Sequence, residues 1–197
     1  MVDGKSTPTG LRERKKMRTR QALTQAALQL CLQRGFEAVT VAEIADAAEV
    51  SVTTLFSYFP SKEALLFDLE PQIDAGLAAA VRDRPAGQDM LEAVRTYLLT
   101  LPPWNPAMRT QYQQFSALVQ NSPALSSYWQ QMWMGHADTL AKVLAAEHGL
   151  DESDLRSRAI AKFVVVAAML AEREPDPSGA LIQVLDLLRV GLDTYTA

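Results

Sequence analysis

The stretch TVAEIADAAEVSVTTLFSYFPSK, residues 40–62, decides the fold of this chain. It has the pattern of two short helices joined by a tight turn. Thr40 and Glu43 form a T-x-x-E capping box, which predicts a helix that begins directly after Thr40. Ser51 can cap a second helix, which Pro60 would end. The stretch therefore predicts a helix-turn-helix, an arrangement that places side chains in the major groove of DNA.

The predicted second helix offers short hydroxyl and methyl groups to DNA. It contains no Arg or Lys, so it cannot make a bidentate arginine–guanine contact. Its groups suit thymine methyls, base edges and phosphate oxygens, and we expect DNA shape to contribute to the readout. The residues expected to contact DNA from this helix are Val52, Thr53, Thr54, Phe56, Ser57 and Tyr58.

Positive charge is concentrated at the start of the chain. Residues 1–34 hold eight Lys and Arg residues against two acidic ones, whereas the whole chain has a net charge of −4. A basic segment beside a helix-turn-helix can contact phosphates or reach into the minor groove, and the alternative is a solvated helix start. Within this basic arm we expect DNA contacts by Arg14, Lys15, Lys16 and Arg18, and outside it by Thr40 and Lys62.

The same region carries a family resemblance that runs unbroken across three predicted helices. The residues that carry it are Arg34–Phe36, Thr40–Val41, Ile44–Ala45, Val50–Ser51, Leu55–Phe56, Tyr58–Phe59 and Ser61–Leu65. On these residues, Arg12–Glu70 resembles the DNA-binding domain of the TetR family of bacterial transcriptional regulators. The resemblance implies a dimer that reads a palindromic operator, usually as a repressor, and an effector bound in the C-terminal body.

Two positions depart from the family pattern. The turn between the two short helices usually contains Gly, and this chain has Glu49. A left-handed Glu49 would cost about 1 kcal/mol because of its Cβ, and its carboxylate would add negative charge near DNA. The other departure is Phe56, where Tyr is usual, and its missing hydroxyl removes one phosphate hydrogen bond.

The chain as a whole is predicted to be all-α. We expect a disordered polar N-terminus over residues 1–11, a three-helix DNA-binding domain over 12–70, and a helical bundle for effector binding and dimerisation over 71–197. A fourth helix is expected over Ser61–Glu70. The last two helices, about Asp154–Arg173 and Ser178–Tyr195, are apolar, and we expect them to form a dimer interface, although these faces could also be internal core.

The predicted body concentrates its aromatic residues between positions 104 and 133. One interpretation is a packed core, and the other is an apolar cavity lined by rings and a few polar groups. The ligand would then be an elongated apolar or aromatic molecule. The candidate ligand residues are Trp104, Tyr112, Phe115, Trp129, Trp133 and His136.

The sequence argues against an enzyme. It has two His residues, one Cys, and no H-E-x-x-H, C-x-x-C or glycine-rich phosphate motif, so we expect no catalytic residue, metal site or cofactor. The single cysteine and the polar N-terminus indicate a cytoplasmic protein. The main alternative is a ligand-insensitive architectural DNA-binding protein, and a helical small-molecule carrier is a third possibility.

Overall fold

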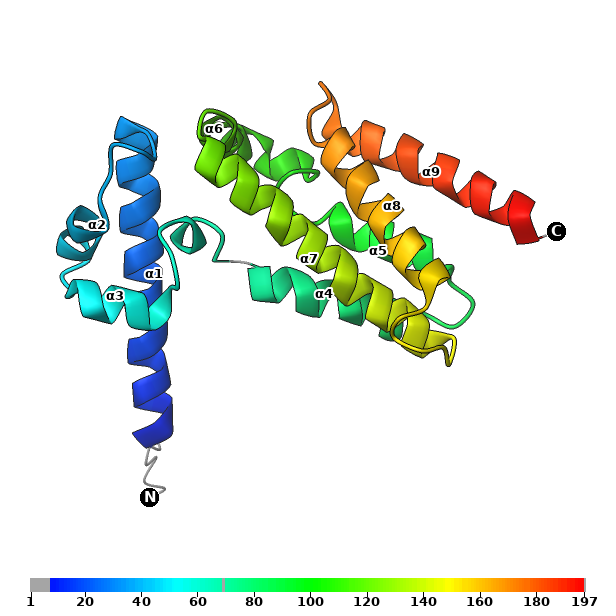
Figure 1. The fold of residues 1–197 in the computed structure, drawn as a ribbon, viewed down its shortest axis with the longest axis horizontal. Coiled ribbons are helices and arrows are strands. Elements are labelled where there is room, and N and C mark those ends of the chain that lie inside the picture. The colour runs from blue at the N-terminus through cyan, green and yellow to red at the C-terminus, as the bar shows by residue number, and fades with distance from the viewer. Residues whose placement is uncertain (1–7, 69, 197) are drawn as a thin grey trace, which may run out of the picture. The chain divides into compact units, whose positions relative to one another are not determined.

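The computed structural model describes residues 8–68 and 70–196 (Figure 1). Over these residues every regular element is a helix, so the all-α prediction is confirmed. The α-helices are α1 (Pro8–Arg34), α2 (Val41–Ala47), α3 (Val52–Tyr58), α4 (Glu70–Arg82), α5 (Met90–Leu98), α6 (Arg109–Gln120), α7 (Pro123–Glu147), α8 (Leu155–Ala171) and α9 (Pro177–Thr196). Two short 3-10 turns, η1 (Glu63–Leu65) and η2 (Pro106–Met108), lie between them.

The chain forms two compact units, the first of which contains α1, α2, α3 and η1. Figure 1 shows α1 as a long helix against which the shorter helices of this unit pack. Its interior is built from apolar side chains of all four elements: Leu23, Ala27, Cys31, Ile44, Leu55 and Leu65. Burial of these side chains, rather than the intrinsic helix propensity of two seven-residue helices, stabilises α2 and α3.

The first unit also includes Ala117–Ser126, where α6 ends and α7 begins. Ser122 explains this assignment, because its buried hydroxyl donates a hydrogen bond of 2.5 Å to Oε1 of Glu37. That hydrogen bond lowers the pKa of Glu37. The remainder of α7 belongs to the second unit, so one continuous helix is shared by both units.

α1 begins at Pro8, within the segment over residues 1–11 that was predicted to be disordered. Proline suits the first turn of a helix because its ring presets φ and its missing N–H has no helical partner to lose. The helix ends at Arg34, and Gly35 follows with a left-handed φ of 82°. Residues 1–7, part of the segment predicted to be disordered, lie outside the described residues.

The turn between α2 and α3 has the geometry anticipated for a helix-turn-helix. The capping box of Thr40 and Glu43 is present at the start of α2. Glu49 adopts a left-handed φ of 55°, and the N–H of Val50 reaches back to the carbonyl of Ala45 at 2.9 Å. Ser51 then caps α3 by accepting a hydrogen bond from the N–H of Thr54 at 3.0 Å.

The predicted helix over Ser61–Glu70 is wrong. The structure has only the 3-10 turn η1 there, and α4 starts at Glu70 with Pro71 in its first turn. Ala64, Leu65 and Phe67 are all buried, so the segment still supplies apolar side chains to the core without forming an α-helix.

The second unit is a bundle in which α4 packs on α5 and α8 packs on α9. Gly76 of α4 lies against the ring of Tyr97, at a point where a Cβ would overlap the ring. An ion pair of 3.0 Å between Arg95 and Asp186 links α5 to α9. α8 is capped by Asp154, whereas Asp151 holds the preceding turn through Ser153.

The left-handed Glu49 predicts a stabilising substitution. Glu49→Gly should raise the free energy of unfolding by about 1 kcal/mol, because glycine has no Cβ to clash in this conformation. Urea denaturation followed by circular dichroism measures this change. Glu49→Ala is the matched control, since it removes the charge and keeps the Cβ. An equal gain in Glu49→Ala would show that the charge, and not the backbone, is responsible.

Candidate DNA interface and effector site

α3 separates its residues sharply between core and surface. Leu55 and Phe59 are buried, while Phe56 is 49% exposed and Val52 is 39% exposed. The four exposed positions 52, 53, 56 and 57 are spaced by one helical turn and share one face. Thr54 and Tyr58 are half-buried at the edge of that face. The structure thus brings the six predicted reading residues onto one helix, four of them on its open side.

Two hydroxyl groups of α3, those of Thr54 and Ser57, have partners within the first unit. Ser57 donates a hydrogen bond of 2.6 Å to the carbonyl of Thr54, whose own hydroxyl lies 2.8 Å from that of Ser51. The proton of Ser57 is therefore engaged, while its oxygen can still accept. The exposed side chains of Val52 and Phe56 are apolar, which suits contact with thymine methyl groups.

Lys62 has a role that the sequence did not indicate. Its ammonium donates hydrogen bonds to the carbonyls of Phe36 at 2.8 Å and Val39 at 2.9 Å, and it lies 3.8 Å from the centre of the Phe36 ring. The ammonium therefore fixes the loop between α1 and α2, and it is turned inward. Phosphate binding by Lys62 stays a prediction that this geometry does not favour.

Thr40 is exposed, but its hydroxyl serves the start of α2. It donates a hydrogen bond of 2.8 Å to Oε2 of Glu43 and accepts one from the N–H of the same residue at 3.2 Å. Arg34 adds an ion pair of 2.8 Å to Glu43. These partners hold the pKa of Glu43 at about 2, with Arg34 contributing most. Glu43 is thus ionised at neutral pH, and the capping box persists.

The basic arm lies on the exposed part of α1 that precedes its first buried residue, Leu23. In Figure 1 this part of α1 projects beyond α3 within the first unit. The side chains of Arg14, Lys15, Lys16 and Arg18 are all exposed. Arg20 differs, because it pairs with Asp68 at 2.5 Å and stacks over Phe59 at 4.6 Å. The four predicted contacts are therefore available to phosphates, and Arg20 serves the fold.

The second unit brings four of the six predicted ligand residues into one buried cluster. Trp104 and Trp133 lie 5.2 Å apart between ring centres, Trp129 and Trp133 6.1 Å, and Trp133 and His136 5.1 Å. Tyr112 and Phe115 are half-buried on α6. The indole N–H of Trp104 is satisfied by the carbonyl of Ala168 at 3.2 Å, which is the behaviour of a core residue.

Two buried nitrogens in this cluster have no hydrogen-bond partner among the described residues: Nε1 of Trp133 and Nε2 of His136. The other ring nitrogen of His136, Nδ1, lies 2.8 Å from the carboxylate of Asp74 on α4. Which ring nitrogen of His136 donates depends on its tautomer, so Nε2 can either donate to or accept from a ligand. Because buried polar groups are normally paired, these two atoms are suited to the polar group of a ligand.

A second polar group in this unit was missed by the sequence interpretation. The carboxylate of Glu172 accepts hydrogen bonds from the hydroxyls of Tyr112 at 2.9 Å and Ser116 at 3.1 Å. Burial raises the pKa of Glu172, and burial together with the nearby carboxylate raises the pKa of Tyr112. The network gives Tyr112 a structural partner, so its role as a ligand residue stays a prediction.

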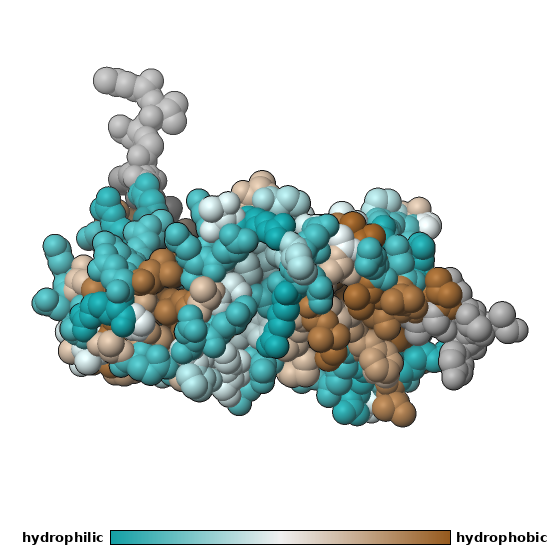
Figure 2. All heavy atoms as spheres, turned by 90° about the horizontal axis from the view of Figure 1, so that it is seen from above, coloured by the Kyte–Doolittle hydropathy of each residue, from teal (hydrophilic) through white to brown (hydrophobic). Residues whose placement is uncertain are grey.

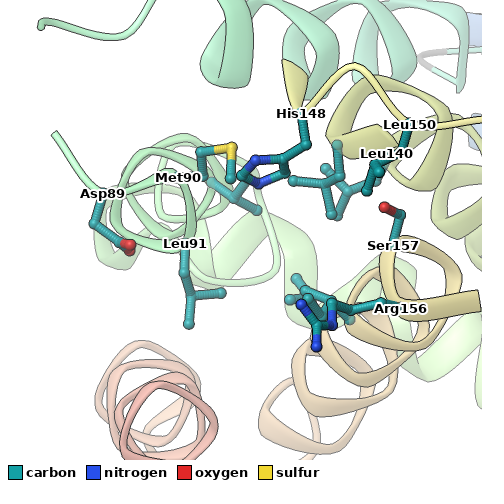
Figure 3. Close-up of a pocket in the computed structure, with 12 residues that line it drawn as sticks. Asp89, Met90, Leu91, Leu140, His148, Leu150, Arg156 and Ser157 are labelled. Atoms are coloured by element: carbon teal, nitrogen blue, oxygen red, sulfur yellow. The ribbon is translucent and has the colours of Figure 1, made fainter. Parts of the chain in front are cut away.

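A cavity of about 270 Å³ lies between α5, α7 and α8 (Figure 3). None of the six predicted ligand residues lines it. Its wall is mostly apolar, and its polar residues are Asp89, His148, Arg156 and Ser157. No sequence pattern indicates this cavity, since its lining comes from three helices that are distant in the chain.

Large apolar side chains are also exposed on the last two helices. Figure 2 shows apolar surface gathered on one face of the second unit. On α8 and α9 the exposed apolar residues include Phe163, Val166, Leu170, Ile182 and Leu187. Exposed apolar surface of this kind is typical of a protein–protein interface.

Within residues 8–68 and 70–196, no group of three or more His, Cys, Asp or Glu side chains is placed to hold a metal ion. No helix in these ranges is long and apolar enough to cross a membrane.

Comparison with known proteins identifies both halves of the chain. Residues 23–69 match the family of bacterial regulatory proteins named tetR, and residues 88–195 match the MftR C-terminal domain. The chain is 33% identical to the transcriptional regulator TcmR of Streptomyces glaucescens, over 86% of this chain and 79% of that protein. It is 25% identical to MftR of Mycobacterium tuberculosis, over 91% of this chain and 94% of that protein.

Among solved structures, the chain is similar to FadR of Thermus thermophilus, a TetR-family transcriptional repressor in complex with lauroyl-CoA. The two are 28% identical, with a TM-score of 0.55, over 86% of this chain and 92% of FadR. These relatives are regulators and not enzymes, in agreement with the sequence.

The internal contacts of Lys62 predict separate effects for two lysines. Lys62→Met should lower the free energy of unfolding by about 2 kcal/mol, because two charge-assisted hydrogen bonds are lost. Lys16→Met should leave the free energy of unfolding unchanged and weaken DNA binding. It should also reduce the slope of log affinity against log salt concentration by about one, because one fewer ion is released on binding. Thermal denaturation and fluorescence anisotropy with labelled duplex DNA measure the two effects. If Lys62→Met weakened DNA binding without destabilising the protein, the internal role would be refuted.

Proposed function

Since the chain belongs to the TetR family of bacterial transcriptional regulators, we propose that it is a cytoplasmic repressor that binds a palindromic operator as a homodimer. A small-molecule effector in the second unit releases it. The observation that carries the proposal is the open face of α3, flanked by the exposed cations of the basic arm. Residues 12–70 are its DNA-binding domain, and residues 71–197 bind the effector and the second subunit.

DNA recognition would use one α3 from each subunit in successive major grooves, about 34–36 Å apart. Val52, Thr53, Phe56 and Ser57 would contact base edges and methyl groups, with Thr54 and Tyr58 at the margin. Arg14, Lys15, Lys16 and Arg18 would contact phosphates. Affinity should therefore fall steeply with salt, whereas sequence preference should come from α3.

Dimerisation would bury the apolar residues of α8 and α9. Phe163, Leu170 and Leu187 are each more than half exposed, at 58%, 60% and 72%. Their burial against a second copy removes apolar surface from water, which is the main driving force of association. A two-fold dimer also matches a two-fold operator.

The effector would enter the aromatic cluster around Trp133 and His136. The rings supply an apolar wall, and the two unpaired nitrogens supply hydrogen bonds. FadR binds lauroyl-CoA, which supports an effector with an acyl chain. Trp104, Tyr112, Phe115 and Trp129 would surround it.

Release would follow from two physical links. The contact of His136 with Asp74 reaches α4, the helix that directly follows the DNA-binding domain in the chain. α7, which carries Trp129 and Trp133, begins within the first unit beside Ser122. An effector that repositions either helix favours a state in which the two α3 helices no longer match the operator spacing.

Selection of bound duplexes from a random DNA pool, at physiological salt, tests the proposal. A short enriched palindrome supports a sequence-specific dimer, and effectors can then be screened by release from that site. If a folded dimer enriches no sequence, the proposal is refuted and the ligand-insensitive architectural alternative is favoured.

The proposed interface predicts the effect of a single charge. Leu187→Glu should weaken the dimer by about a hundredfold or more, because each interface would bury an unpaired carboxylate. The folded monomer should remain, since this side chain is exposed within one chain. Sedimentation velocity over a range of concentrations measures the dissociation constant. Leu32→Glu on α1 is the control and should stay dimeric. A dimer of unchanged strength in Leu187→Glu would place the interface elsewhere.

A further inference from the structure

The cavity between α5, α7 and α8 has an apolar interior and a cationic edge. Leu91, Leu140 and Leu144 line its interior. Figure 3 shows the guanidinium of Arg156 extending from α8 toward α5, and the imidazole of His148 directed from the end of α7 toward Met90. The two basic side chains are exposed and line the same cavity, one from α8 and the other from the residue that follows α7.

Among the described side chains the guanidinium of Arg156 forms no ion pair, although its charge helps to lower the pKa of Asp154. Two acidic residues of this region serve as helix caps. Asp154 caps α8 by accepting a hydrogen bond of 2.7 Å from the N–H of Ser157, and Asp89 caps α5 by accepting one of 3.0 Å from the N–H of Glu92. An arginine beside an apolar cavity, with the local carboxylates used as helix caps, can take an anionic group from a ligand.

The volume of the cavity limits the ligand. At 270 Å³ it lies just below the range of drug-sized pockets and holds roughly nine water-sized groups. That space accommodates an unbranched chain of about ten carbons and excludes a nucleotide carrier such as coenzyme A. Leucine and valine walls offer such a chain no hydrogen bonds, so only its end requires a polar partner.

We propose that this cavity binds a medium-chain carboxylate, with its tail among Leu91, Leu140 and Leu144 and its carboxylate on Arg156 and His148. The proposal rests on the proposed function and changes it in one respect: the effector occupies this cavity, beside the aromatic cluster, and acts on the cluster from there. Leu140 is one helical turn from His136, and Val164 of the cavity is one turn from Ala168, whose carbonyl holds Trp104. The chain end would thus press on the aromatic cluster.

Isothermal titration calorimetry of the full-length protein with decanoate tests the proposal, with decanol as the uncharged ligand of equal length. We expect one decanoate per chain and about tenfold weaker binding of decanol. Arg156→Gln should weaken decanoate binding about tenfold and leave decanol binding unchanged. Arg158→Gln is the matched control on the same exposed helix end and should bind both ligands like the unmodified protein.

A further variant tests the location independently of charge. Ile160→Phe should fill the cavity and weaken both ligands, while the melting temperature in the absence of ligand shows that the protein is folded. The proposal would be overturned if decanoate and decanol bound equally well. It would also be overturned if Arg156→Gln and Arg158→Gln had equal effects, or if decanoate binding were not saturable.

The effector role is tested separately. Release of the selected duplex by decanoate supports both the cavity assignment and the proposed function. Decanoate binding that depends on Arg156, without release of the duplex, supports the cavity assignment and contradicts only its role as the effector site.

Discussion

The DNA-binding surface depends on one tight reversal of the chain, the left-handed turn at Glu49. The chain leaves α2 and enters α3 within four residues, and only a positive φ at this point lets the N–H of Val50 return to the carbonyl of Ala45. This hydrogen bond fixes the angle between the two helices. Leu55 and Phe59 can then enter the core while Val52 and Phe56 stay outside. A glutamate at this position accepts backbone strain that glycine would avoid.

The second unit is organised around buried polar groups within an apolar bundle. Trp104 is satisfied by a backbone carbonyl, and Tyr112 by Glu172, so these parts of the aromatic cluster behave as core. Trp133 and His136 keep one unpaired nitrogen each, and such atoms are costly to bury. His136 also contacts Asp74 on α4. The same residue therefore connects the interior, where a ligand would bind, to the helix that follows the DNA-binding domain.

The local signals in the sequence predicted much of the fold. The capping residues Thr40 and Ser51 correctly predicted the starts of α2 and α3. The 3-10 turn after α3 was missed, because the apolar spacing of Ala64, Leu65 and Phe67 does not distinguish it from an α-helix.

The candidate site was less accessible to sequence reasoning. The open face of α3 follows from helical spacing, but the inward turn of Lys62 depends on carbonyls more than twenty residues away. The cavity near Arg156 likewise requires three helices to meet. His148 is exposed and also lines this cavity.

The distance between the two α3 helices of a dimer tests the central claim most directly. Cys31 is the only cysteine and is buried, so a spin label attached at Thr53→Cys reports the reading helices alone. Double electron–electron resonance of the DNA-bound protein should give a distance centred at about 34–36 Å, broadened by the label. The absence of dipolar coupling between subunits, or a distance that no pair of successive major grooves allows, would contradict a dimeric reader of two-fold DNA.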